Sequence, residues 1–506
     1  MAFATQASAR WAQLDGTRRG FITRCENFAA YTIPKICLPD NQNDSNRNMS
    51  QDFQAVGAQA TNHLANKLML ALFAPSRPFF RLDPSKAIAK QIAEAGVNET
   101  EVAEALAEAE KAAIAVLDKK AIRPKLYEAS KHLIVTGNVL IDLSDTFRVI
   151  GIKKYVVRRS LSGKVLEMII ADKLTIDELE DNVRDAAMLA LSANADRTVT
   201  LYRWIRRNAD GDYVMDQWVD TYKLPSEFDG KWPEDKLPFR PLTWDLADGM
   251  HYGSGLVEDY ENDFAGLSAL SRAQVQGAIL ASEFRWLVNP AGMTRVEDFE
   301  GTANGGAMPG QEGDIVLVQS GKAGDLQITM NMAAEYVNRI GRGFLMGSQL
   351  IRDAERVTAE EIRLVAQELE TALGGAYSRI AVDFQMPLAH WLLAEIDVPI
   401  RNFEPSIVTG LDALSRGGDL DELKLWLADI AALNNLPEGA LRELNLGPLY
   451  KALAIPRRIK VDSYIKSEAQ KAAEAEAQQQ MMAQQAAMQA GVNVAENGAM
   501  VQQEQE

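Results

Sequence analysis

Residues that build many catalytic and metal sites are scarce in this chain. Its 506 residues include two cysteines and four histidines. No His-Glu-x-x-His or Cys-x-x-Cys spacing occurs, so the pattern of a zinc site is missing. The histidines are widely spaced along the chain, at His63, His132, His251 and His390. We interpret each of them as a packed or surface residue and expect no metal site.

A phosphate-binding loop is also missing. The Gly-Lys pairs at Gly163, Gly230 and Gly321 are followed by Val, Trp and Ala, so none supplies the hydroxyl that such a loop offers to Mg²⁺. A serine–histidine–acid triad is recognised by geometry, which spacing does not show. Acidic pairs such as Glu360-Glu361 stand where a helix N-terminus favours negative charge. We therefore expect neither catalysis nor a cofactor.

Long apolar runs are absent as well. No stretch of about 18 apolar residues exists, and the N-terminal sequence MAFATQASARWAQLDG has no apolar signal core. These absences predict neither a membrane span nor secretion. Cys25 and Cys37 could bridge in an oxidising compartment, whereas in a cytosolic product we expect both thiols to be reduced.

The chain also lacks an excess of basic residues. The chain carries 53 Lys and Arg against 70 Asp and Glu, a formal net charge of −17. Acidic proteins repel phosphates, so tight binding of nucleic acid is excluded as a property of the whole surface. Any contact with a polyanion must depend on a few local cations.

The centre of the chain has an unusual layout. Helical periodicity covers Tyr252–Trp286, a glycine-rich insert follows over 287–328, and a second helix is predicted over about Thr329–Phe344. A short charged loop then leads to a long helix over Thr358–Ile396. The first two helices are rods of roughly 25 to 50 Å, and such a stalk needs neighbours beside it.

The first helix has one apolar stripe, which buries one face. Its members recur at three- and four-residue steps: Leu256, Tyr260, Phe264, Leu267, Leu270, Ala278 and Ala281. A surface helix packed on a domain core is the plainer interpretation. The insert favours a protruding β module instead, because the apolar runs Ile315–Val318 and Leu326–Ile328 are typical of short strands between turns.

Start and break signals mark the long helix. Thr358 and Glu361 form a capping box, which places the helix start. Gly374-Gly375 and Pro387 interrupt the apolar stripe, so we expect a bent helix of about 40 residues. The last 40 residues, 467–506, are rich in Ala, Gln, Glu and Met, which favours partial disorder.

The N-terminal half alternates between helical and strand patterns, which predicts an α+β domain ending near Trp244–Gly253. Helices are expected near residues 5–30, 50–73, 98–120 and 123–136. Strands are expected at Val139–Leu143, Val156–Arg159, Val165–Ile170, Val199–Ile205 and Tyr213–Val219.

Six segments stand out in the region from about residue 20 to 460: Asn62–Phe73, Gly137–Leu140, Val288–Gly292, Glu355–Arg363, Leu373–Ser378 and Thr409–Leu411. In the same order, they resemble blocks of the head-to-tail connector, or portal, proteins of short-tailed (podovirus-type) bacteriophages. Agreement in order over so many blocks is more specific than any single motif.

The resemblance implies an α+β, mainly helical portal fold that assembles into a ring with a central channel. The implied parts are a wing (1–252), first stem helix (253–287), clip (288–328), second stem helix (329–347), tunnel loop (348–357), kinked wing and crown helix (358–397), crown (398–466) and tail (467–506).

The resemblance also implies a function without catalysis. A ring, expected to hold twelve subunits, would sit at one capsid vertex of the virion after assembly in the host cytoplasm. It would pass double-stranded DNA during packaging and ejection. The implied partners are the terminase (packaging ATPase), the tail adaptor, the major capsid protein and the scaffolding protein, with no membrane.

Cationic residues near the implied channel are the candidate DNA contacts: Arg352, Arg356, Arg342, Arg339 and Lys322. For Arg356 the alternative is an ion pair with Glu355, Glu360 or a neighbouring subunit. Two other functions stay open. One is a non-annular helical adaptor or scaffold of the phage head that binds partner helices, and the other is a head-associated hydrolase or nuclease.

Overall fold

The structure is a computed structural model that describes most of the chain up to residue 346 and short pieces beyond it. The described residues are 6–42, 53–73, 78–84, 99–191, 197–282, 285–318, 323–346, 368–369, 371–374, 379–396 and 403–407, with 428, 431 and 449. Contacts divide the chain into two units, Met1–Leu411 and Asp412–Glu506. Every element below belongs to the first unit.

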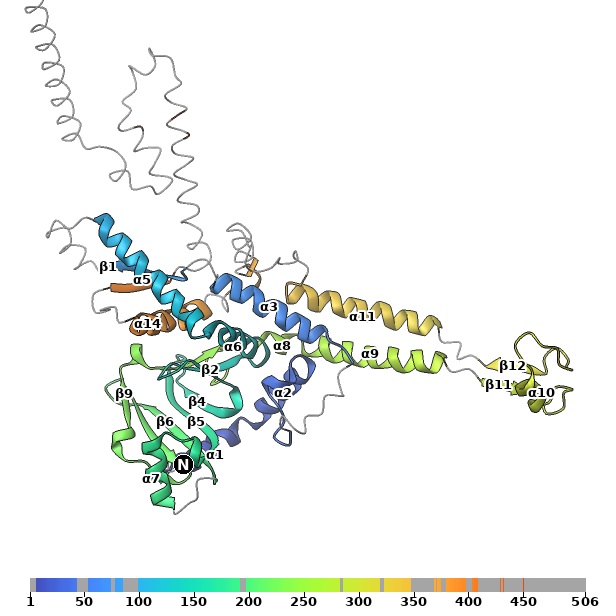
Figure 1. Cartoon of the computed structure of the whole chain (residues 1–506), viewed down its shortest axis with the longest axis horizontal. Coiled ribbons are helices and arrows are strands. Elements are labelled where there is room, and N and C mark those ends of the chain that lie inside the picture. The colour runs from blue at the N-terminus through green and yellow to red at the C-terminus, as the bar shows by residue number, and fades with distance from the viewer. Residues whose placement is uncertain are drawn as a thin grey trace, which may run out of the picture. The chain divides into compact units, whose positions relative to one another are not determined.

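Several predictions fall outside the described residues and stay predictions. They concern the tunnel loop (348–357), the Thr358–Glu361 capping box, most of the crown (398–466) and the tail (467–506). Within the described part, the fold is α+β and mainly helical, as the sequence predicts (Figure 1).

Helices dominate the first 136 residues, close to where periodicity predicts them. They are α1 (Ala7–Thr17), α2 (Arg19–Tyr31), α3 (Val56–Leu72), α5 (Glu99–Lys119) and α6 (Ile122–Thr136), with the short helix η1 (Pro34–Ile36) after α2. The prediction of one helix over 5–30 is wrong. The helix breaks at Arg18, whose buried guanidinium donates from Nη1 to the carbonyl oxygen of Ile152 (2.8 Å).

A six-stranded antiparallel sheet forms the next layer, in the order β4-β5-β6-β7-β8 with β9 also paired to β7. Its strands are β4 (Tyr155–Arg159), β5 (Val165–Thr175), β6 (Thr198–Arg207), β7 (Tyr213–Val219), β8 (Tyr222–Lys223) and β9 (Gly230–Trp232). Side chains alternate between its faces. Ile169 packs with Ala7 and Trp204 under α1, whereas Met168 and Ile170 face the main core.

Two smaller sheets and one helix complete the body. The first sheet pairs β10 (Phe239–Thr243) with β2 (Asn138–Asp142) and β2 with β3 (Arg148–Ile150). The second pairs β1 (Phe80–Pro84) with β13 (Phe403–Ile407), which lie more than 300 residues apart in sequence. Helix α7 (Asp181–Leu191) adds Val183 to a small apolar cluster with Val199 and Val219 of the large sheet.

Two antiparallel helices extend from this body, with a small β module between them in sequence (Figure 1). After the short α8 (Leu256–Asp259) come α9 (Glu261–Ser282), then β11 (Arg285–Val288), α10 (Val296–Gly301) and β12 (Ile315–Val318), then α11 (Ala323–Gly343). We call α9 and α11 the helical pair and residues 285–318 the end module.

One of the two strands predicted in the insert is wrong. Ile315–Val318 is strand β12, paired with β11, but Leu326–Ile328 lies inside α11, which begins at Ala323 and not near Thr329. Three apolar residues do not reveal their own period. Here Leu326 packs against Gly277 of α9, and this contact between two helices favours a helix over a strand.

Before β13 the chain forms a helix with a wide turn. Residues Ala381–Gln385 form a π-helical turn, and α14 (Met386–Glu395) follows directly. Pro387 lacks an N–H, so the carbonyl four residues before it loses its intrahelical partner, and a wider turn accommodates the ring. The interruption expected at Pro387 is therefore present as this π turn.

Among the described residues, no helix combines the length and apolar character needed to cross a bilayer.

Candidate functional site

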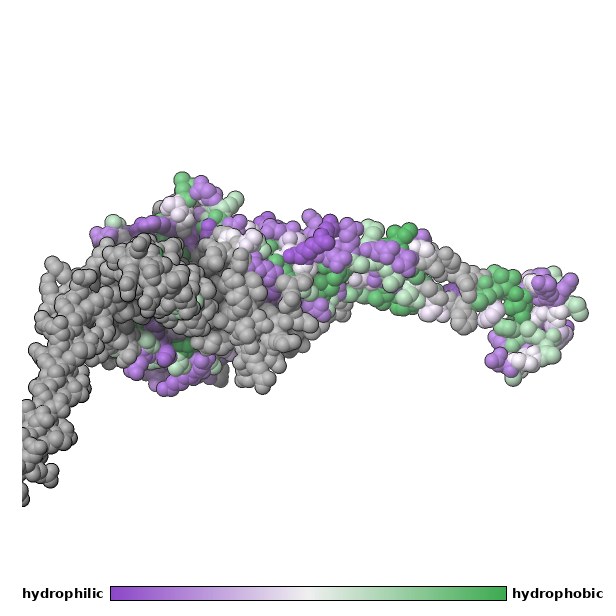
Figure 2. Space-filling view, turned by 90° about the horizontal axis from the view of Figure 1, so that it is seen from above, coloured by the Kyte–Doolittle hydropathy of each residue, from purple (hydrophilic) through white to green (hydrophobic). Residues whose placement is uncertain are grey.

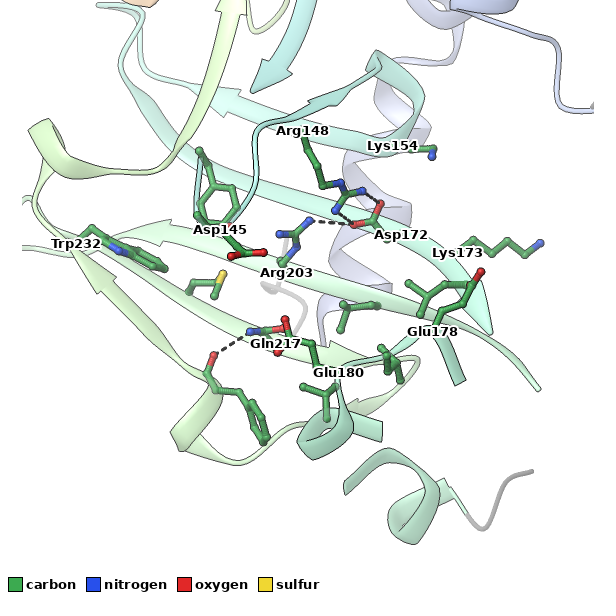
Figure 3. A pocket seen from close by; sticks show the side chains of 18 residues that line it. Asp145, Arg148, Lys154, Asp172, Lys173, Glu178, Glu180, Arg203, Gln217 and Trp232 are labelled. Atoms are coloured by element: carbon green, nitrogen blue, oxygen red, sulfur yellow. Dashed lines mark hydrogen bonds and ion pairs between the residues drawn. The ribbon is translucent and has the colours of Figure 1, made fainter. Parts of the chain in front are cut away.

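A pocket of about 560 Å³ opens on the large sheet, and two of its arginines form ion pairs with buried carboxylates (Figure 3). Arg203 contacts Asp142 at 2.8 Å and Asp172 at 3.0 Å, and Arg148 contacts Asp172 at 2.9 Å. Although burial alone would raise the pKa of Asp172, hydrogen bonds from both arginines hold it below its ordinary value. The pairs join β2, β3, β5 and β6, and no histidine or cysteine lines this pocket.

A second buried ion pair joins α1 to the other face of the sheet. Arg10 donates to both oxygens of Glu167, at 2.9 and 2.6 Å, and Trp204 Nε1 donates to the same carboxylate at 2.9 Å. Burial favours the neutral acid, but the hydrogen bonds from Arg10 and Arg158 lower the pKa of Glu167 below its ordinary value. Both charges are satisfied within the fold, so we assign them a structural role.

The chain that leads into the helical pair is held to the body by a close backbone contact at the start of α8. Gly137 ends α6 in the left-handed region (φ +70°), which favours glycine. A Cβ atom at Gly255, the N-cap of α8, would lie 2.7 Å from the backbone nitrogen of Gly137 and 2.7 Å from the carbonyl oxygen of Ile134. Neither atom can move aside, so both positions require glycine.

Asn138 locks this contact with its side-chain amide. Its Nδ2 donates to the carbonyl oxygens of Thr136 (2.8 Å) and Gly253 (2.6 Å), and its Oδ1 accepts from the Gly253 N–H (2.9 Å). Both Asn138 and Gly253 are buried. We call Gly137, Asn138, Gly253 and Gly255 the anchor.

The other helix of the pair is held where it ends. Leu345, just after α11, has φ +58°, and its carbonyl oxygen lies 2.9 Å from Lys67 Nζ and 3.1 Å from His63 Nε2. Lys67 is only 1% exposed and also contacts Glu368 at 2.9 Å. A buried lysine needs such partners. Helix α3 therefore fixes the residues on both sides of the segment that contains the predicted tunnel loop.

Glycines allow the two helices to approach closely. A Cβ atom at Gly266 would lie 2.9 Å from the Tyr336 ring, and one at Gly277 would lie 2.6 Å from Leu326. At Gly343 the clash with Tyr260 would be at 2.2 Å. The order of these contacts shows that α9 and α11 run antiparallel.

Burial along the pair is uneven. Near the body, Phe264, Leu267, Ile340 and Phe344 are at most 2% exposed, and the Phe264 and Phe344 rings meet edge to face at 5.7 Å. Away from the body α9 is no longer covered, and Ala278 of its predicted stripe is exposed. There, large apolar side chains are exposed on both helices: Val275, Ile279 and Leu280 on α9, and Ile328, Met330 and Met332 on α11.

The exposed apolar side chains are not confined to one face. Ile328 and Met330 are 60% and 55% exposed, and residues two apart in a helix point about 200° apart. Residues 273–282 and 326–334 contain no charged side chain. A helix that is apolar on two sides is ordinarily covered by neighbours. Figure 2 shows hydrophobic areas along the pair and on the end module.

The end module is organised by one carboxylate. Asp314 accepts from the backbone N–H groups of Met293, Thr294 and Gln311 at 3.0 to 3.2 Å, which holds the pKa of Asp314 below its ordinary value. Its β11–β12 hairpin exposes Trp286, Leu287 and Val316. The module is therefore internally hydrogen-bonded and exposes several large apolar side chains beside its charged residues.

Two of the five predicted DNA contacts lie in the described residues. Arg339 pairs with Asp263 across the helical pair at 3.0 Å and stacks on Tyr336, with 4.5 Å to the ring centroid. Arg342 is exposed in the last turn of α11 and forms no ion pair within the described part. Arg352, Arg356 and Lys322 lie outside the described residues.

Cysteines and histidines form no reactive cluster where the structure describes them. Cys25 and Cys37 are buried free thiols, and burial raises the pKa of Cys37 to about 12. His132 is buried, and its pKa falls to about 4 because burial disfavours the charged ring. Within the described ranges, no group of three or more His, Cys, Asp or Glu side chains could hold a metal ion.

The helical pair and the end module expose large apolar side chains outside the body, a feature typical of surfaces that contact other proteins. Comparison with known proteins agrees. The family model described as bacteriophage head to tail connecting protein matches residues 4–455. The chain belongs to this family.

Curated relatives match along most of their length. The portal protein of Escherichia phage T7 is 33% identical over 509 residues, covering 97% of this chain and 92% of the relative. That of Enterobacteria phage SP6 is 33% identical over 86% and 85% of the two chains. That of Pseudomonas phage phiKMV is 32% identical over 95% of each. The predicted resemblance is confirmed.

Sequence reasoning missed the anchor and the buried lysine. Gly137 and Asn138 were named only within a segment that resembles the family. Lys67 was not singled out, because a lysine on a helix ordinarily faces water. The one usable signal was a Gly-Asn pair directly after a predicted helix, which is typical of a left-handed C-cap.

Proposed function

We propose that this protein is the subunit of a portal ring at one capsid vertex, which forms the conduit for double-stranded DNA. Membership of the connector family supports the position between head and tail. The observation that carries the proposal is the helical pair, whose outer half exposes apolar side chains on opposite sides and has no charged residue over 273–282 and 326–334. Its role is mechanical, with no chemical step assigned to it.

Opposite apolar flanks favour a ring over a dimer. A two-fold dimer uses one self-complementary patch, whereas a ring joins two different surfaces of each subunit until the rotation closes. The flanks containing Ile328 and Met330 supply two such surfaces. In this proposal the helical pair is the stem, the body before it is the wing and the end module is the clip, with twelve copies expected.

Charge suits a conduit through which DNA slides. The overall charge of −17 discourages trapping of the duplex, so contacts depend on a few cations. Arg342 is the stronger described candidate, because Arg339 is already paired with Asp263. Arg352, Arg356 and Lys322 remain proposed contacts, as do the docking of the packaging ATPase and tail adaptor on the end module and contacts with capsid and scaffolding proteins.

Packaging assays test the conduit. We expect Arg342→Gln to leave assembly intact but to lower packaged or retained DNA, and Arg352→Ala with Arg356→Ala to do the same. Lys236→Ala, at an exposed position of the body, is the matched control. Normal packaging and retention in all of these variants would remove the proposed DNA contacts.

A non-annular adaptor is the second candidate. The same exposed apolar surface of the helical pair could bind a partner helix. An adaptor would remain monomeric or dimeric when purified alone, so sedimentation velocity across a range of salt concentrations separates the two proposals.

A further inference from the structure

Three arginines from separate segments meet in a second pocket of the body, about 570 Å³ in volume. Arg159 ends β4, Arg240 lies in β10, and Arg379 lies two residues before the π turn. Asp383, within the π turn, lines the same pocket. Apolar side chains including Leu242, Leu246 and Met386 form other parts of the wall.

Two of the three guanidinium groups are held by neutral acceptors. Arg159 donates to the backbone oxygens of His251, Gly163 and Pro241, at 3.3, 3.0 and 2.8 Å. Arg240 donates to the backbone oxygen of Asp235. Within the part of the chain that the structure describes, none of the three arginines forms an ion pair with a carboxylate.

Two donor atoms of these arginines have no hydrogen-bond partner in the described part of the chain. Nε of Arg240 and Nη1 of Arg379 are buried and have no hydrogen-bond partner among the described residues. A buried, unsatisfied donor on a charged group is costly. The pocket of Figure 3 differs in its ion pairs, because its Arg148 and Arg203 contact carboxylates at 2.8 to 3.0 Å, although Nε of Arg203 is also buried without a hydrogen-bond partner within the described ranges.

Positive charge is in excess here, although the whole chain is acidic. The lining contains Arg159, Lys164, Arg240 and Arg379 against Glu234, Asp235 and Asp383. Glu234 is already shared by Lys164 (3.3 Å) and Arg207 (2.9 Å).

The charged groups in this pocket are crowded. Burial raises the pKa of Asp383 despite the three arginines, and burial lowers the pKa of Arg159 and of Arg240. A bound anion would give these arginines a second negatively charged partner beside Asp383.

We propose that this pocket binds a phosphate-type oxyanion, using Arg159, Arg240 and Arg379 as its donors. A guanidinium presents paired N–H groups that match phosphate oxygens. Arg159 is fixed in place by its three backbone acceptors, so little is lost in ordering it. The volume accommodates more than one phosphate group, as in a pyrophosphate or a phosphodiester segment. This binding site stands independently of the portal proposal.

Titration calorimetry of the full-length protein with inorganic pyrophosphate tests the site. We expect saturable binding that weakens at least tenfold in Arg240→Gln and in Arg379→Gln. Arg184→Gln is the matched control, because Arg184 pairs with Asp181 on α7, away from the pocket. The control variant is expected to bind as the parent protein does.

Asp383→Asn separates a binding role from a folding role. Removing the only carboxylate of the π turn leaves the arginines without that counter-charge, so pyrophosphate should bind several-fold more tightly. A damaged fold cannot produce this gain. Unchanged or weaker binding in Asp383→Asn would overturn the proposal, whatever the arginine variants do.

A second arm uses a short DNA duplex to find the source of the phosphate. Duplex binding that pyrophosphate displaces, and that Arg240→Gln weakens, identifies a backbone phosphodiester as the ligand. Pyrophosphate binding without duplex binding identifies a free anion. If the parent protein binds neither ligand, or binds both equally well in the arginine variants, the pocket is not an oxyanion site.

Discussion

The anchor gives the sharpest prediction about how the helical pair is held. Asn138→Ala removes three hydrogen bonds, two to Gly253 and one to Thr136, at 2.6 to 2.9 Å. At roughly 1 kcal/mol each, their loss costs about 3 kcal/mol of local stability. Because Gly253 is buried, water does not readily replace the lost partner.

Hydrogen exchange measures this loss where it occurs. A change of about 3 kcal/mol corresponds to roughly a hundredfold larger population of the open state, so amides of residues 253–264 should exchange about a hundredfold faster. Amides of the large sheet, such as those of β6, should change far less, because local opening does not require global unfolding.

Asn331→Ala is the matched control. Asn331 is exposed on α11, and its side chain accepts one hydrogen bond from Gln327 at 3.2 Å. Its replacement should alter stability by less than about 0.5 kcal/mol. Equal exchange in the two variants, or acceleration spread evenly over the body in Asn138→Ala, would refute the assignment of Asn138 as the lock between body and helix.

Other predictions concern packing, charge and pH. Gly343→Ala should destabilise the helical pair by about 1–3 kcal/mol through its clash with Tyr260, and Tyr260→Ala in the same chain should recover part of that loss in thermal unfolding. Glu167→Gln should cost about 3–5 kcal/mol by leaving a buried arginine unpaired, whereas exposed Glu227→Gln should be neutral in the same melts. Buried His132 stays neutral down to pH of about 4, whereas the unfolded ring binds a proton below its ordinary pKa of 6.5. Stability should therefore fall by about 3 kcal/mol as pH drops from 6.5 to 4, and a pH profile of unfolding that His132→Phe leaves unchanged would contradict this.

Local patterns predicted the elements well, because period and turn residues are written in short stretches of sequence. Strands β4 to β7 and the helices up to residue 136 lie close to their predicted ranges, apart from the break at Arg18, whereas the short strands β8 and β9 were not predicted. The contact made by Arg18 at the break could not be predicted, because its acceptor, the carbonyl group of Ile152, lies 134 residues away. Leu326–Ile328 was misread because its helical partner lies on α9.

The candidate site was predicted only as a set of residue types. Cations near the channel can be chosen from sequence, but the pairing of Arg339 with Asp263 depends on how α9 and α11 are aligned. The same holds for the buried Lys67, whose partners are 278 and 301 residues away. The uncovered outer half of the helical pair appears only once the fold shows which part of the stripe the body covers.

Negative-stain electron microscopy of the purified chain, with native mass spectrometry of the same sample, tests the central claim most directly. The portal proposal predicts rings with a central hole and a mass near that of twelve subunits of 55.7 kDa. A compact monomer or dimer that persists at micromolar concentration across salt conditions would contradict it and favour the adaptor.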